Sequence, residues 1–396
     1  MDAYELLSPV GNFEMLYSAI EAGADSVYFG IKGFNMREGA RNFKIGDLKK
    51  IKRICLNSPR KVKRYLTLNT VIYDSELKKI EKLISKAKDF VDAIICWDSS
   101  IIHLCKKYNV PFQVSTQASV SNSFSAEFYK KQGARKFVLA RELNLKQIKE
   151  ISNKSYDVEC FAHGAMCVAV SGRCFTSQFL HGISANRGQC AQPCRRAWKV
   201  SDDSGNELKL DNNKVMSAKD LCTLPFIEQM KKAGIKTFKI EGRNRSPEYV
   251  YTVTKVYRKA LDNKLTDKEI REGIEELKKV YNRGFSEGFY FKMPTADDFS
   301  YSETGEQTES KEYIGRIEKY WSKSGSASVL IHHGKLKVGD WIYLISEKNS
   351  VKKVKIETIE KDKERISVAK KGMEVGVKLP KCFKGDKVYL IKEKRK

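Results

Sequence analysis

Cysteines carry the most distinctive chemistry that this sequence offers. The chain has 396 residues and ten cysteines, and half of these cysteines lie in one stretch, at Cys167, Cys174, Cys190, Cys194 and Cys222. The first four follow a C-x6-C-x15-C-x3-C pattern. Thiolates are ligands for soft metals, so this clustering predicts a metal or redox centre.

The spacing of these cysteines bears on which centre they hold. Iron–sulfur clusters take four thiolates. Structural zinc takes four cysteines mostly as closely spaced pairs, and only Cys190 and Cys194 have such spacing. Wide spacing beside glycines favours a bulky iron–sulfur cluster, because glycines let backbone N–H groups approach the sulfurs. Zinc and a redox-active pair remain alternatives. The other cysteines lie in apolar runs or on helical faces, and we expect them to be buried thiols: Cys55, Cys96, Cys105, Cys160 and Cys382.

Short apolar runs alternate with amphipathic stretches over the first 260 residues. The runs cover residues 5–10, 26–30, 64–69, 93–98, 112–116, 136–140, 158–163 and 237–242. Such alternation is typical of parallel strands covered by helices, and eight units predict a closed (β/α)8 barrel of the TIM type. No GxGxxG motif follows any of the runs, so the sequence gives no support to a dinucleotide-binding fold.

Polar side chains gather where these predicted strands end. The carboxyl ends of barrel strands meet at one mouth, where active sites lie. The candidate site residues at these ends are Asn69, Gln117, His163, Glu241 and Arg243, and Arg173 lies among the cysteines. Each of these residues also has a purely structural interpretation. In that interpretation His163 is buried in the core with its hydrogen bonds satisfied, and Asn69 and Gln117 cap loops. Arg243 then forms an ion pair with Glu241.

The spacing of the runs also predicts the domain organisation. About 70 residues separate the seventh run from the eighth, so we expect a barrel over residues 1–300 with a cysteine-rich insertion at about 164–236. Alternating short strands then predict a small β-barrel over 311–396, with strands at 312–320, 326–333, 340–346, 351–359, 365–371 and 387–392. Its pattern resembles the second β-barrel domain of translation GTPases. This region has 23 Lys and Arg against 11 Asp and Glu.

The overall charge points to an anionic partner. Lys and Arg number 74 against 49 Asp and Glu, which gives a net charge of +25. A field of this size attracts polyanions, with nucleic acid as the first candidate and an anionic membrane surface as the second. The start of the chain lacks the pattern of a secretory signal, and no apolar run reaches the length of a membrane span. We therefore expect a cytoplasmic protein with no membrane span and with reduced cysteines.

One segment of the chain is specific enough to indicate a family. ECFAHGAMCVAVSGRC, residues 159–174, resembles the signature of the collagenase-like proteases, peptidase family U32. The segments NRGQCAQPCRRAW, SAKDLC and KIEGRNRSPEYV match the family in order, as does ELLSPVGNFEMLYSAIEAGADSVYFG at the start. Thr176 departs from the signature, which has an aliphatic residue there. The resemblance covers residues 4 to about 390.

This resemblance implies a function that the older family label does not describe. It implies an oxygen-independent hydroxylase with a 4Fe-4S cluster held by Cys167, Cys174, Cys190 and Cys194, with Cys222 as an alternative fourth ligand. One family branch hydroxylates the wobble uridine of tRNA, with prephenate as the implicated oxygen donor; others act on a ribosomal RNA cytidine or on ubiquinone precursors. The basic C-terminal region makes the tRNA branch the closest, so we expect 5-hydroxyuridine formation, with ribosomal RNA as an alternative substrate.

The candidate residues take roles within that expectation. His163 and Glu241 are the catalytic candidates. Arg173 and Arg243 would bind the carboxylates of prephenate, since guanidinium matches carboxylate geometry. Asn69 and Gln117 would contact a uracil extruded from its stack; these lie with Arg173 and Arg243 in the predicted substrate site.

Two other function classes stay open at this point. A peptidase is one, but the sequence has neither HExxH nor GxSxG, and a Cys–His pair would use cysteines assigned to the cluster. The second is an RNA-binding protein with a purely structural cluster.

Overall fold

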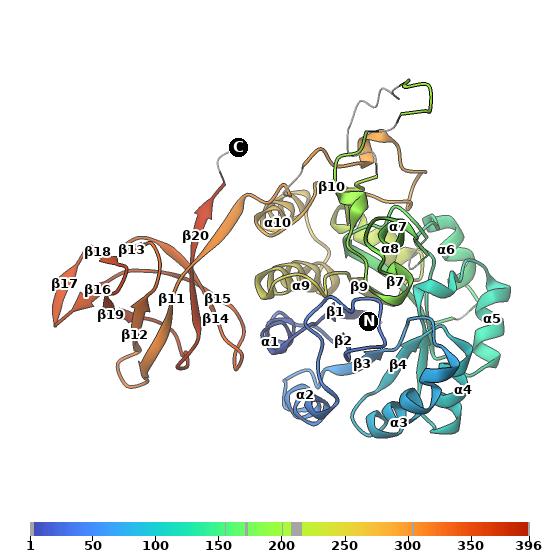
Figure 1. Cartoon of the computed structure of the whole chain (residues 1–396), viewed down its shortest axis with the longest axis horizontal. Helices are drawn as coiled ribbons and strands as arrows, with labels where there is room; N and C mark the ends of the chain where they lie inside the picture. Colours follow the sequence, from blue (N-terminus) through green and yellow to red (C-terminus); the bar gives the residue numbers. More distant parts are fainter. Residues whose placement is uncertain are drawn as a thin grey trace.

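The structure is a computed structural model that describes residues 4–154, 156–170, 173–199, 201–206, 216–302 and 305–394. Two units follow one another along the chain (Figure 1). Helices and strands alternate in the first unit, whereas the second is made of strands. None of the described helices is long and apolar enough to cross a membrane.

Eight parallel strands form a closed barrel in the first unit. Strands β1 to β7 pair in chain order, and β9 pairs with both β1 and β7, which closes the ring. This confirms the predicted (β/α)8 barrel, and each of the eight predicted runs overlaps one strand. The strands are β1 (Glu5–Pro9), β2 (Ser26–Gly30), β3 (Lys63–Thr67), β4 (Ala93–Cys96), β5 (Phe112–Val114), β6 (Lys136–Val138), β7 (Val158–Gly164) and β9 (Thr237–Ile240).

Helices cover the outside of this barrel. Asn12, Asp98, Asn122 and Asn144 begin four of them, and each side chain accepts a backbone N–H of the first helical turn. Such caps fix the turn from strand to helix. The helices are α1 (Phe13–Glu21), α2 (Leu48–Leu56), α3 (Leu77–Ala87), α4 (Ser99–Lys107), α5 (Ser123–Lys131), α6 (Leu145–Ser152), α8 (Ile227–Lys232) and α9 (Pro247–Asp262). Helix α10 (Asp267–Lys279) packs on α9.

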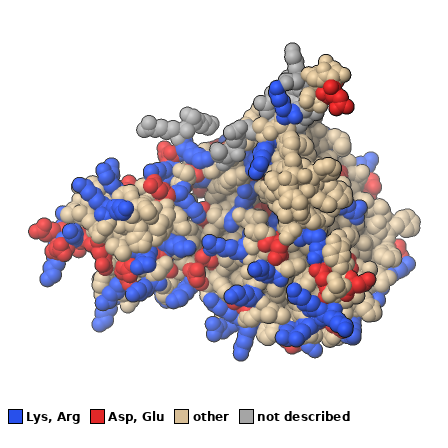
Figure 2. All heavy atoms as spheres, in the orientation of Figure 1, with Lys and Arg blue, Asp and Glu red and all other residues tan. Residues whose placement is uncertain are grey.

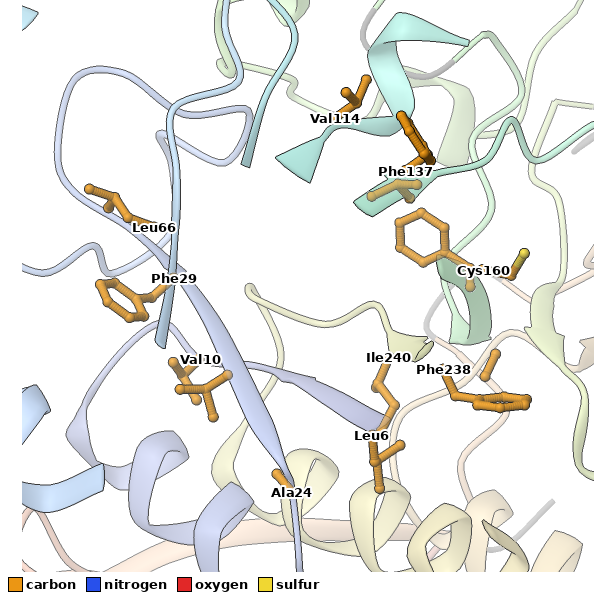
Figure 3. Close-up of a cluster of buried hydrophobic side chains, with 14 of the residues drawn as sticks. Leu6, Val10, Ala24, Phe29, Leu66, Val114, Phe137, Cys160, Phe238 and Ile240 are labelled. Atoms are coloured by element: carbon orange, nitrogen blue, oxygen red, sulfur yellow. The ribbon is translucent and has the colours of Figure 1, made fainter. Parts of the chain in front are cut away.

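The main apolar core lies between the strands and the helices, whereas the barrel interior is partly polar. Side chains such as Leu6, Phe29 and Phe238 belong to the outer layer (Figure 3). Inside the barrel, Lys136 Nζ lies 2.9 Å from Glu5 Oε2, and Lys239 Nζ lies 2.7 Å from Glu159 Oε1. Buried charges need such partners.

The chain between β7 and β9 forms the predicted insertion. It contains α7 (Thr176–His181) and β8 (Asp220–Cys222), which runs antiparallel to β7. The two-residue strand β10 (Phe285–Ser286) then pairs with β8. Short 3₁₀ turns complete the first unit: η1 (Ile45–Asp47), η2 (Asp74–Glu76), η3 (Thr116–Ala118), η4 (Ala185–Arg187), η5 (Pro193–Arg195), η6 (Leu224–Phe226) and η7 (Ala296–Asp298). The sequence pattern had indicated neither β8 nor β10.

The second unit is an antiparallel β-sheet domain around its own apolar core. Eight strands form one sheet and two form a ribbon, β13 with β18. The strands are β11 (Glu309–Trp321), β12 (Ser326–Ile331), β13 (Lys335–Lys337), β14 (Trp341–Ile345), β15 (Lys352–Lys355), β16 (Ile359–Lys361), β17 (Glu364–Ile366), β18 (Val368–Lys370), β19 (Glu374–Lys378) and β20 (Lys387–Glu393). The predicted strands over 351–359 and 365–371 are each divided in two, and β19 was not predicted.

The second unit rests on α1 and α9 of the barrel. The Val351 backbone N–H donates to Ser18 Oγ at 3.3 Å, and Lys311 Nζ lies 2.6 Å from Glu248 Oε1. Tyr251 of α9 packs against a cluster formed by Tyr343, Ile345 and Val351. The second unit therefore does not cover the carboxyl ends of the barrel strands. The insertion lies at those ends instead.

Candidate functional site

A cavity of about 470 Å³ lies at the carboxyl ends of the barrel strands. Its floor and walls come from the strands and from the loops that follow them, and the insertion supplies one side. Ligand sites of barrel enzymes occupy this end. The described lining includes Tyr28, Arg37, Thr67, Asn69, Ser115, Gln117, Arg141, Phe161, Cys167, Ile183, Cys190, Gln192, Cys194, Arg195, Lys239, Glu241 and Arg243.

The insertion brings thiols to this cavity. Cys167, Cys190 and Cys194 line it, and Cys167 and Cys190 are exposed. Burial raises the pKa of Cys194, Arg195 lowers it, and the charges of Cys167, Cys190 and Cys174 raise it further. The other three predicted ligands therefore lie within electrostatic range of Cys194.

Backbone hydrogen bonds hold the cysteine loops in place. The Cys174 N–H donates to Asn186 Oδ1 at 2.8 Å, and the Ala191 N–H donates to Ser177 Oγ at 3.1 Å. Gly188 has φ of 86°, and a Cβ there would lie 2.2 Å from the Asn35 carbonyl oxygen. Only glycine allows this loop to approach the β2–α2 loop so closely.

Cys222 lies apart from this group. It is buried on β8, and the described lining of the cavity does not include it. Burial raises the pKa of its thiol to about 11, and the Tyr257 hydroxyl donates to its sulfur at 3.8 Å.

Arg243 is a buried cation held by neutral oxygens. Its guanidinium donates to Thr67 Oγ1 at 3.1 Å, to Asn35 Oδ1 at 2.8 Å and to Asn42 Oδ1 at 2.5 Å. Burial lowers its pKa to about 10. Gly30 makes room for it, because a Cβ at Gly30 would lie 2.2 Å from Arg243 Nη2. The expected alternative, an ion pair of Arg243 with Glu241, is not formed; Glu241 pairs with Arg37 instead, at 3.3 Å.

Glu241 is held in its charged form. Burial acts to raise its pKa, but Arg37, Arg245 and Arg141 outweigh burial, and the pKa is lowered. Arg141 stacks over the Phe161 ring at 3.7 Å from the centroid, and its Nη1 donates to the Ala165 carbonyl at 2.8 Å.

Arg141 differs from Arg37 in having no carboxylate at ion-pair distance among the described residues. Burial lowers its pKa. A partly buried guanidinium on a cavity wall with only carbonyl and sulfur partners from the protein is suited to an anionic ligand.

Two amides meet on the cavity wall. Asn69 Nδ2 lies 3.3 Å from Ser115 Oγ and 3.4 Å from Gln117 Oε1, and Asn69 Oδ1 accepts the Met36 N–H at 3.2 Å. Asn69 and Gln117 are thus brought together at the cavity, as the sequence predicted.

His163 lies behind the wall. On β7 and β9, Phe161 faces Lys239 but His163 faces Ile240, so the register shifts by one residue. Such a bulge moves a side chain to the other face of the strand. His163 Nδ1 lies 3.4 Å from the Tyr257 hydroxyl, and burial lowers its pKa to about 3. The described residues that line the cavity include no histidine, so the structure does not place His163 with its expected catalytic partner Glu241.

Arg173 is also away from the cavity. It is exposed, and the described lining does not include it. Sequence reasoning instead missed Arg37, Arg141 and Lys239. Two of these had a signal: Arg141 directly follows the sixth run, and Lys239 alternates with Thr237 and Glu241 along the eighth strand, as inward-facing residues do.

The sequence was compared with known proteins. The model of "Peptidase family U32" matches residues 11–300. A protein named "Collagenase" from Porphyromonas gingivalis (strain ATCC BAA-308 / W83) is 41% identical, covering 98% of this chain and 97% of its own. "tRNA hydroxylation protein P1" from Bacillus subtilis (strain 168) is 35% identical over 80% of this chain and 77% of its own. "23S rRNA 5-hydroxycytidine C2501 synthase" from Escherichia coli (strain K12) is 38% identical over 65% of this chain and 39% of its own.

Proposed function

The chain belongs to peptidase family U32, and we propose that it is an RNA hydroxylase that converts a tRNA uridine, at the wobble position, to 5-hydroxyuridine. The observation that carries the proposal is the meeting of thiols and unpaired cations in one cavity. Cys167, Cys190 and Cys194 face the same space as Arg141 and Arg243.

The thiols at the cavity are the chemistry that a 4Fe-4S cluster needs. Cys167, Cys174, Cys190 and Cys194 would hold it, because three of them line the cavity and Cys167 and Cys190 are exposed there. Among the described residues no three of these side chains are already gathered as metal ligands, so binding would have to draw the cysteine loops together. Cys222 is less suited, since its thiol is buried beside Tyr257. A bound cluster supplies redox or Lewis-acid chemistry of iron at the edge of the cavity.

The cations fit a small oxygen donor that carries carboxylates, such as prephenate. Five basic side chains line the cavity against two acidic ones, namely Arg37, Arg141, Arg195, Lys239 and Arg243 against Glu38 and Glu241. Arg141 and Arg243 have no carboxylate partner among the described residues, so their charge is free to bind an anion. Arg173, the other expected partner of the carboxylates, is exposed and is not among the described lining residues, so we assign this task to Arg141 and Arg243.

Glu241 is the protein group suited to move a proton in this cavity. It lines the cavity, and its pKa is lowered by three arginines, so it stays ionised and can accept a proton from a bound substrate. His163 is neutral and walled off, so we assign it no proton transfer.

The amide pair would orient the nucleobase. Asn69 and Gln117 carry donors and acceptors that match the edge of a uracil, and Tyr28 on the cavity floor offers a ring. Chemistry on a base needs the base to leave its stack and enter such a pocket. The net charge of +25 supports an RNA substrate, because phosphate contacts supply most of the affinity for nucleic acids.

A peptidase activity is the second candidate, because the relative named collagenase is more similar to this chain than the relative named for tRNA hydroxylation. The site gives it less support. Cys167 is exposed at the cavity, but no histidine is among the described lining residues to activate it.

Mass spectrometry of nucleosides tests the proposal. A strain that lacks the gene should lose 5-hydroxyuridine from its tRNA, and the wild-type gene but not a Cys167→Ala variant should restore it. Loss of a hydroxylated cytidine from ribosomal RNA alone would move the substrate to ribosomal RNA. Unchanged tRNA and ribosomal RNA, together with hydrolysis of denatured collagen by the purified protein but not by Cys167→Ala, would establish the peptidase instead.

A further inference from the structure

Helix α7 presents two aromatic rings to solvent. Phe175 and Phe179 are 64% and 92% exposed, and the Phe179 N–H donates to the Phe175 carbonyl at 3.0 Å. Phe175 is the N-cap residue of α7 and Phe179 lies four residues later, so the two side chains project from the same side of the helix. Ser177 is fully buried on the opposite side, where its hydroxyl accepts the Ala191 N–H. We call the surface of Phe175 and Phe179 the α7 face.

The charge around the α7 face is one-sided. Asp and Glu make up about one residue in eight of the chain, yet none occurs from residue 160 to 201, where five Lys and Arg occur. Arg187 is paired with Glu76, and Arg195 is bound to backbone carbonyls. Arg173 and Arg196 are exposed. The surface around α7 in Figure 1 is largely uncharged in the view of Figure 2, with few acidic groups to repel an anion.

The α7 face adjoins the cavity through the chain itself. Gly182 ends α7 in the left-handed conformation, and the next residue, Ile183, lines the cavity. On its buried side α7 is bonded to Ala191, which lies between Cys190 and Gln192 of the lining. A strand that delivers one base to the cavity would therefore have its neighbouring nucleotides near α7.

We infer that the α7 face is a stacking platform for unpaired nucleotides next to the target base, with Arg173 and Arg196 contacting their phosphates. The inference rests on the proposed function, since it assumes an RNA substrate. Exposed rings together with basic side chains are the pattern by which proteins bind single strands, because every base has a face that can stack. The absence of acidic residues over 160–201 favours this polyanion over a protein partner as the occupant.

Binding of a single-stranded oligoribonucleotide tests the inference without any turnover. Phe179→Ala should weaken binding about 5- to 150-fold, since stacking of a base on an aromatic ring is lost. Phe179→Trp should retain binding, whereas Phe179→Leu should lose it, because leucine is apolar but has no ring. A duplex of the same sequence should bind equally well to all variants.

A matched control lies on another helix. Phe124 and Phe128 of α5 are also four apart and exposed, at 83% and 58%. The double variant Phe124→Ala/Phe128→Ala should bind the oligonucleotide as the wild type does. Unchanged affinity in Phe175→Ala/Phe179→Ala, or an equal loss in the α5 pair, would overturn the assignment.

The two proposals fail separately. If tRNA nucleosides are unchanged in the deletion strain but Phe179→Ala still weakens single-strand binding, the hydroxylation is wrong and the platform stands. If hydroxylation is confirmed and the α7 variants bind normally, the platform is wrong.

Discussion

The ion pair of Lys239 with Glu159 gives the sharpest test of how the barrel interior supports the site. Lys239 lines the cavity and its Nζ lies 2.7 Å from Glu159 Oε1. Glu159 is fully buried, and its Oε2 has no hydrogen-bond partner in the structure. Lys239 forms the ion pair with this carboxylate, and Lys136 acts on it from farther away, so the change Lys239→Met should leave a buried charge with much weaker compensation.

The expected magnitude follows from that geometry. Removing one partner of a buried pair costs about 3–5 kcal/mol of unfolding free energy, whereas replacing both partners is often close to neutral. Lys239→Met removes one partner and Glu159→Gln/Lys239→Met replaces both, so the two variants separate these outcomes.

Urea unfolding of the wild type and the two variants measures this effect. Lys239→Met should be less stable than the wild type by about 3–5 kcal/mol. Glu159→Gln/Lys239→Met is the control and should recover most of the loss. A single variant that loses less than about 1 kcal/mol, or a double variant no more stable than the single one, would refute the reasoning.

Three further predictions concern the cavity and its surroundings. Anaerobically purified protein should be brown with about four irons per chain. Cys167→Ala and Cys190→Ala should lose the colour, whereas Cys222→Ala and Cys55→Ala should keep it. A colourless protein with one zinc would contradict the assignment. Arg243→Lys should weaken the affinity for prephenate, measured by calorimetry, about tenfold or more, because at least one charge-assisted hydrogen bond is lost. The control Arg173→Lys, at an exposed position, should bind prephenate as the wild type does. Equal affinities in all three proteins would remove Arg243 from the donor site. The pKa of His163 in the folded protein is lowered to about 3. Between about pH 6.5 and pH 3 the unfolded chain therefore binds one more proton than the folded protein, and stability falls as the pH falls. In urea unfolding, His163→Phe should lose less stability than the wild type between pH 7.5 and pH 5.5, and an equal loss would show that His163 is not buried in its neutral form.

The barrel could be predicted because its signals are local. Each strand is a short apolar run followed by a polar turn, and Asn12 and Asn144 supply recognisable helix caps. In the second unit this approach worked less well. The β16–β17 hairpin turns through Asp362 and Lys363, both with positive φ, although a two-residue turn of this kind usually contains glycine or asparagine. That turn nevertheless falls between the predicted strands over 351–359 and 365–371. The breaks that were missed lie inside these two stretches, where the chain changes partner: β15 pairs with β14 but β16 with β19, and β17 pairs with β16 but β18 with β13. Alternation along a sequence does not reveal a change of partner.

The placement of the predicted site residues follows from the same local signals. Asn69, Gln117, Glu241 and Arg243 follow strands and reach the cavity. His163 also ends a strand, but one extra residue on β7 turns it away, and alternation along a sequence does not reveal a bulge. Arg37 was missed because it comes from a loop after β2, where no periodic pattern identifies which residues return to the mouth.

The two halves of the site depend on a few contacts between distant segments. The barrel supplies Lys239 from a strand and Arg37, Arg141 and Arg243 from the loops that follow strands. The insertion supplies the thiols from loops with little regular structure. Arg187 joins them by donating to the Val71 carbonyl and pairing with Glu76 at 2.5 Å, and the Glu38 N–H donates to the Gly188 carbonyl at 3.0 Å. Because Arg187 and Gly188 lie on the same short loop as Cys190, these contacts hold the thiols close to the arginines. The chemistry we propose therefore depends as much on these contacts between the insertion and the barrel as on the cysteine ligands themselves.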